Sequence, residues 1–161
     1  PDMISSPWSS WVADTTSEQY RRSLYIFGKR ISPHPMITTF DGTGRNVCVS
    51  RRIRTNTPLQ ALALLNDTTF YLAAQRLAEV MAEASDVSSG LEKGYKRVML
   101  RSPDTEKLEI LRTLYEDAYE HYQKQAFEQK APNTENDQAR LGALALVANT
   151  MLNMDEFVTK N

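Results

Sequence analysis

The chain has 161 residues, of which 41% are hydrophobic and 24% are charged, and its formal net charge is -1. These values are typical of a soluble globular protein of about one domain, long enough to bury a core. The near-neutral net charge excludes binding of nucleic acid through a large overall positive charge.

The charges are unevenly distributed along the chain. Residues 1–57 hold 8 Lys/Arg and 4 Asp/Glu, a net of +4, whereas residues 58–161 hold 11 and 16, a net of -5. We therefore expect the basic N-terminal third to pair with the acidic remainder or with another acidic surface.

Cysteine usage and hydropathy exclude further classes of protein. Cys48 is the only cysteine, so neither an intramolecular disulfide nor a C-x-x-C-H haem attachment motif is present. No apolar run approaches the roughly 18 residues of a transmembrane helix, and no signal peptide opens the chain. Because the chain begins with Pro1 rather than methionine, we interpret it as an excised domain and expect any targeting signal upstream of it.

Residues 1–16 are rich in Ser and Pro and show no periodicity. They predict an extended arm or linker ahead of a single helical domain at 17–161. Trp8 and Trp11 either dock this arm on the domain through their indoles or pack on a missing upstream domain.

The next segment predicts one helix and then irregular structure. Ser17 suits the N-cap of a helix that runs to about Lys29, with Tyr20, Leu24 and Phe27 on one face. Prolines at 33 and 35 end this helix, and residues 36–50 are irregular apart from a short strand considered at 47–49. We interpret His34 as a surface or packing residue rather than a ligand.

The clearest helix start of the chain lies at residues 57–60. Thr57 is a good N-cap, Pro58 suits the first helical position, and Gln60 completes a capping box. The apolar residues that follow have helical spacing and predict a buried stripe. This stripe consists of Leu59, Leu62, Ala63 and Leu65.

The densest cationic cluster, formed by Arg51, Arg52 and Arg54, comes just before this helix start. Together with Thr57 and the free N–H groups of a first helical turn, it suits an anion or an acidic partner. Three interpretations remain open: pairing with carboxylates of the helical body, binding to an upstream domain, and binding of a small anion or acidic glycan. Nucleic acid is not among them, because the basic residues form no stripe with interleaved aromatic residues.

Apolar residues at helical spacing predict four further helices, at 68–84, 91–100, 103–129 and 135–152. Asp67 caps the first of these, Gly90 opens the second, and Pro103 starts the third. The last is rich in Ala and Leu and apolar enough to be the central helix of a bundle. The predicted fold class is therefore all-α, a bundle of five or six helices with an irregular N-terminal third.

Two carboxylate groups are candidates for chemistry. Asp155 and Glu156 follow the last helix, but no histidine is near and no calcium-loop spacing exists, so we expect solvent-exposed carboxylates beside a C-capping Asn153. A second group of carboxylates lies beside His121 and is interpreted as a solvated helix face rather than an acid–base pair. Its members are Glu116, Asp117 and Glu120.

Neither a nucleophile elbow nor a phosphate loop is present. No catalytic residue, metal ligand or cofactor is assigned to this domain, and whether it forms part of an enzyme is left open.

Several blocks of the sequence resemble a known bacterial family, the C-terminal domain of unknown function of large exported proteins found in planctomycetes and their relatives. The blocks are 20–30 (YRRSLYIFGKR), 32–40 (SPHPMITTF), 51–67 (RRIRTNTPLQALALLND) and 147–157 (VANTMLNMDEF). That family typically has Gly-Arg-x-Pro ahead of the long helix, whereas this chain has Leu100-Arg101-Ser102-Pro103 and lacks the glycine.

The resemblance implies export to the periplasm or cell surface and a multidomain parent, in which upstream domains of the same polypeptide are the partners. Family members commonly carry a cytochrome-c-like N-terminal domain, so the resemblance places any haem upstream and links the parent to redox chemistry. It implies no activity and no catalytic residues.

Three functional hypotheses follow. The first is a non-catalytic interaction or structural module. The second is a glycan- or anion-binding module that uses the arginine cluster at 51–54 and the arm of Trp8 and Trp11, and an exposed aromatic platform in a cleft would favour it. The third is part of an enzyme whose active site needs upstream domains, which a cluster of buried carboxylates would favour.

Overall fold

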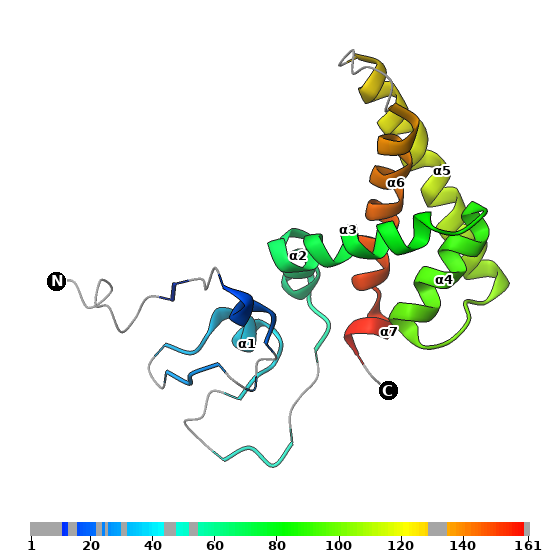
Figure 1. The fold of residues 1–161 in the computed structure, drawn as a ribbon. Helices are drawn as coiled ribbons and strands as arrows, with labels where there is room; N and C mark the ends of the chain where they lie inside the picture. Colours follow the sequence, from blue (N-terminus) through cyan, green and yellow to red (C-terminus); the bar gives the residue numbers. More distant parts are fainter. Residues whose placement is uncertain are drawn as a thin grey trace. The chain divides into compact units, whose positions relative to one another are not determined.

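A computed structural model describes residues 11–12, 16–21, 24, 26–29, 32–43, 48–51, 55–128 and 135–159 (Figure 1). The chain divides into two compact units, Pro1–Gln60 and Ala61–Asn161. This division lies at a different position from the predicted boundary after residue 16, and the assignment of 17–161 to a single domain stays a prediction.

Every regular element in the described part of the chain is helical, which confirms the all-α fold class. The elements are a 3-10 helix η1 (Ser17–Tyr20) and the α-helices α1 (Pro35–Thr39), α2 (Pro58–Asn66), α3 (Thr68–Ala82), α4 (Val87–Met99), α5 (Thr105–Glu128), α6 (Glu135–Leu152) and α7 (Asp155–Val158). The two shortest α-helices, α1 and α7, were not predicted from the sequence. None of the described helices combines the length and apolar character needed to cross a membrane.

The second unit is built around α6, as the sequence predicts. This helix packs against α3, α4, α5 and α7, and Figure 1 shows it antiparallel to α5. Four residues of α6 have no exposed surface: Ala143, Val147, Ala148 and Met151. They belong to one apolar cluster with the buried faces of α3, α4 and α5, where periodicity also predicted an apolar face.

Aspartate caps fix where two of these helices begin. Oδ1 of Asp67 accepts hydrogen bonds from the backbone N–H groups of Thr69 (2.9 Å) and Phe70 (3.3 Å), which confirms the predicted N-cap of α3. Oδ2 of Asp86 accepts from the backbone N–H of Ser89 (3.0 Å). The predicted start of α4 at residue 91 is therefore wrong, because Asp86 begins the helix at Val87.

Gly90 lies inside α4, at a point where this helix approaches α3 closely. A Cβ atom at Gly90 would lie 2.6 Å from the backbone oxygen of Met81, and one at Gly94 would lie 2.6 Å from Sδ of the same residue. Both glycines are buried. They allow close packing of the two helices. From the sequence alone, Gly90 is interpreted as the start of a helix, because the pattern does not show which helices pack closely.

The connection from α4 to α5 turns through a left-handed residue. Leu100 has φ 59° and ψ 21°, and its N–H donates to the backbone oxygen of Lys96 (2.9 Å). This conformation ordinarily favours glycine. Helix α5 begins two residues later than predicted, with the backbone oxygen of Asp104 accepting from the N–H of Leu108 (3.0 Å).

The predicted helix over 17–29 is wrong. Thr16 caps only the 3-10 turn η1, and the chain becomes extended at Arg21, with φ -72° and ψ 146°. Leu24 is 80% exposed and Phe27 is 73% exposed, so their helical spacing does not correspond to a buried face. The irregular structure predicted from Met36 onward is also partly wrong, because Nδ1 of His34 accepts a hydrogen bond from the N–H of Met36 (3.3 Å) and caps α1.

The buried stripe predicted for α2 is wrong as well. Its leucines are exposed: Leu59 by 61%, Leu62 by 57% and Leu65 by 42%. The buried residues of α2 are instead Gln60 and Leu64, one helical turn apart. The polar side chain of Gln60 thus lies on the buried face of α2.

Candidate functional site

The most specific sequence block of the chain, at 51–67, includes a network of hydrogen bonds centred on Gln60. Gln60 is 2% exposed. Its Nε2 donates to the backbone oxygen of Thr39 (2.8 Å) and to Oγ1 of Thr55 (3.2 Å). Its Oε1 accepts from the backbone N–H of Thr57 (2.9 Å), whose Oγ1 accepts from the N–H of Gln60 (3.3 Å). The predicted capping box is therefore confirmed.

Asp41 completes this network, which we call the Gln60 network. Oδ2 of Asp41 accepts from the backbone N–H of Thr55 (2.7 Å), and Oδ1 accepts from the Thr55 hydroxyl (2.8 Å). Asp41 has φ 56°, a conformation that aspartate tolerates better than most residues. The hydrogen bonds from Thr55 hold the pKa of Asp41 below its usual value. The network thus joins the end of α1 to the start of α2.

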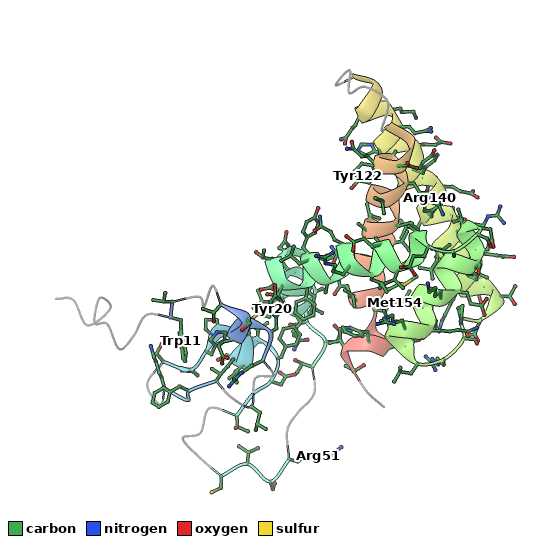
Figure 2. The ribbon with its side chains drawn as sticks, viewed as in Figure 1. Trp11, Tyr20, Arg51, Tyr122, Arg140 and Met154 are labelled. Carbon is green, nitrogen blue, oxygen red and sulfur yellow. The ribbon has the colours of Figure 1, made fainter. Side chains whose placement is uncertain are left out.

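The Asp41–Thr55 contact closes the segment 42–54, whose sequence contains four arginines and no carboxylate. Of the predicted anion-binding residues, Thr57 serves as a helix cap in the capping box. Arg51 is exposed and forms no ion pair with any residue that the structure describes (Figure 2). Arg52 and Arg54 lie outside the described residues, so their pairing with carboxylates of the chain stays a prediction.

Trp11 docks on a neighbouring segment of the first unit. Its Nε1 donates to the backbone oxygen of Ser32 (3.0 Å), and its ring meets the ring of His34 edge-on at 4.9 Å between centroids. Nζ of Lys29 lies 4.4 Å from the centre of the indole ring. Of the two interpretations of the arm, docking through the indole therefore describes Trp11, whereas Trp8 lies outside the described residues.

A second polar cluster surrounds Glu156 of α7. Its carboxylate accepts hydrogen bonds from the hydroxyl of Tyr95 (3.0 Å) and from the side chains of Arg101 and Lys107. The bonds from Lys107, Arg101 and Tyr95 lower the pKa of Glu156 to about 2. Asp155 and Glu156 are both exposed, as expected from the sequence. The hydrogen bonds of Glu156 nevertheless attach α7 to α4 and to the start of α5.

The carboxylates in the middle of α5 are exposed, as interpreted from the sequence. Oε1 of Glu116 pairs with Nε of Arg112 (2.9 Å) one turn earlier. Within the described ranges, no group of three or more His, Cys, Asp or Glu side chains is arranged to hold a metal ion.

The fold and these clusters define an all-α module whose main polar networks join its helices to one another. Residues 3–115 match the family model described as PSD1, Protein of unknown function (DUF1553). The chain therefore belongs to this family of unknown function. The matched region includes both the Gln60 network and the left-handed turn at Leu100. No curated protein and no solved structure matches the chain.

Proposed function

We propose that this chain is a non-catalytic interaction module of an exported, multidomain bacterial protein of planctomycete type. In this proposal the arginine-rich segment 42–54 docks on an acidic surface of another domain of the same polypeptide, and a haem group belongs to an upstream domain. The resemblance of the sequence blocks given above supports this setting. Periplasmic or cell-surface location and the link to redox chemistry have the same support.

The observation that carries the docking proposal is the closure of segment 42–54 by the Gln60 network. Both ends of the segment are fixed by hydrogen bonds between Asp41 and Thr55. Between them lie four positive charges and no negative charge, and Arg51 is exposed to solvent. Such a segment attracts an acidic surface and orients it, because complementary charges accelerate association and suppress wrong partners.

The state of the carboxylates supports a non-catalytic role. A general acid or base works best with a pKa near the working pH. Asp41 and Glu156 both have lowered pKa values, because hydrogen-bond donors already surround their oxygens. Asp41 and Glu156 therefore stay ionised near neutral pH and hold parts of the fold together. Neither carboxylate is suited to proton transfer at that pH.

The test is an affinity measurement between chain 1–161 and the remaining domains of the parent polypeptide, expressed separately. We expect association that weakens with added salt, because it depends on screened charges. Replacing Arg51, Arg52 and Arg54 together by glutamate should weaken binding by at least about tenfold, or 1.4 kcal/mol.

The matched control is Arg112→Glu, which reverses an exposed arginine on α5 of the second unit. This variant should bind as the parent does. Absence of association at low salt, or equal losses in the control and the triple variant, would show that segment 42–54 is not the docking surface.

A further inference from the structure

The second unit contains a groove of about 470 Å³ between α3 and α6 that the proposed function does not use. Side chains from α3, α5 and α6 line it, and they combine aromatic, aliphatic and amide groups. The residues that matter for its chemistry are Tyr71, Gln75, Tyr122, Leu141, Leu146 and Asn149.

Two tyrosines on different helices border this groove. Tyr71 of α3 is 50% exposed. Tyr122 of α5 packs over Gly142 of α6, since a Cβ atom at Gly142 would lie 3.3–3.4 Å from three carbons of the ring. Figure 2 shows Tyr122 where α5 runs beside α6. The groove therefore offers aromatic surface of the kind on which the C–H face of a sugar ring packs.

Amide groups lie in the same groove with unused hydrogen-bonding capacity. The side chain of Gln75 is partly exposed and forms no hydrogen bond with any described residue. Nδ2 of Asn149 makes one long bond to the backbone oxygen of Leu65 (3.4 Å), while its Oδ1 is shielded from water and has no partner within the described structure. An amide both donates and accepts, as a hydroxyl group does.

The charges around the groove favour a neutral ligand. Among the residues that the structure describes, its lining contains no Lys or Arg and one carboxylate, that of Glu79. Glu79 is paired with Arg76 at 2.9 Å on the same helix. An anionic ligand would find no cation in the lining, whereas an uncharged ligand rich in hydroxyl groups matches the tyrosine and amide side chains.

From this juxtaposition we infer that the groove between α3 and α6 binds a neutral oligosaccharide. A pyranose ring packs against Tyr71, and the hydroxyl groups beside it bond to Gln75 and Asn149. The leucines at 141 and 146 exclude water from the opposite side of the ring. This site lies in the other unit from segment 42–54, so it is independent of the docking proposal.

The test is isothermal titration calorimetry of chain 1–161 with three probes: cellohexaose, mannohexaose and chitohexaose. We expect at least one to bind at millimolar concentration or below. Tyr71→Ala should weaken that binding by about tenfold, because it removes the aromatic face, and Gln75→Ala by about fivefold. Both side chains are at the surface, and an unchanged thermal midpoint would show that the variants fold.

The matched control is Tyr20→Ala, which removes a tyrosine that is 61% exposed in the other unit. It should leave saccharide binding unchanged. Methyl NMR adds a second measurement, in which the bound probe should shift Leu141 and Leu146 and leave Leu91 unchanged. Absence of binding by all three probes, or equal losses in Tyr20→Ala and Tyr71→Ala, would overturn the inference. The inference would also be overturned if an apolar helical peptide bound in the groove and the sugars did not displace it.

Discussion

The two units of the chain bury different kinds of groups. Among the described residues of Pro1–Gln60, Gln60 is the one buried residue, and it is polar. In Ala61–Asn161, the buried cluster consists of apolar side chains together with Tyr95 and Tyr115. The first unit thus depends on directed hydrogen bonds, and the second depends mainly on burial of apolar surface.

This difference predicts how each unit responds to substitution. Apolar burial is non-directional, so a core tolerates changes that keep its volume. A hydrogen-bond network fails when one member is removed, because the remaining donors and acceptors lose their partners. The two kinds of interaction can therefore be tested separately by single substitutions in each unit.

The largest effect is expected for Leu144→Ala in the second unit. Leu144 is 2% exposed on the central helix α6, and removing its side chain leaves a cavity. We expect a loss of about 3 kcal/mol in the free energy of unfolding, measured by urea denaturation. Leu62→Ala is the control, because Leu62 is 57% exposed, and its effect should stay within about 0.5 kcal/mol. Similar losses in the two variants would contradict the assignment of the core.

A smaller and local effect is expected for Gln60→Ala. The substitution leaves the backbone oxygen of Thr39 and the N–H of Thr57 without their partner, which costs about 2 kcal/mol. Amide hydrogen exchange at Thr55, whose N–H bonds to Asp41, should accelerate roughly 30-fold. Amides of α6 should keep their protection. Unchanged exchange at Thr55 would show that the contact with Asp41 does not depend on Gln60.

Leu100→Gly should stabilise the second unit. Leu100 has a positive φ, which costs a residue with a Cβ atom about 1 kcal/mol relative to glycine, and its side chain is 84% exposed. The thermal midpoint should therefore rise by several degrees, although a glycine usually destabilises a chain. Leu100→Ala, which keeps the Cβ atom, should show no such increase. A lower midpoint for the glycine variant would mean that the Leu100 side chain contributes stability.

The smallest effect concerns pH and Glu156. The folded chain holds the pKa of Glu156 at about 2, below the value of about 4.3 for a free glutamate. Its contribution to stability is therefore complete above the free value and is lost as the pH falls through 2. Denaturation at several pH values should show Glu156→Gln less stable than the parent at pH 6, with a difference that shrinks steadily as the pH falls to 2. A difference independent of pH would exclude the carboxylate charge as the cause.

The sequence predicts well those helices whose apolar face is covered by another helix in the structure. Helix α6 has the predicted bounds, and α3 differs only at its C-terminal end. The spacing of Tyr20, Leu24 and Phe27 is equally helical, yet all three side chains are exposed. Periodicity reports which residues would share a face, and it cannot report whether another element covers that face.

The polar contacts were only partly predictable for a related reason. The capping box joins residues three apart, so the sequence alone specifies it. The bond from Gln60 to Thr39 spans 21 residues. The bonds that Glu156 accepts from Lys107, Arg101 and Tyr95 span 49, 55 and 61 residues. Contacts of this length depend on the packing of the helices that bring the partners together.

The docking of Trp11 has a spectroscopic consequence. Trp8 and Trp11 are the only tryptophans of the chain, and both belong to the first unit. Indole emission therefore reports on that unit alone, whereas far-ultraviolet ellipticity comes mostly from helices α3 to α6. Since the Trp11 indole is bonded to Ser32 and lies against His34, release of this contact would shift the emission to longer wavelength. Both signals, recorded on one heated sample, would separate the melting of the two units without any label.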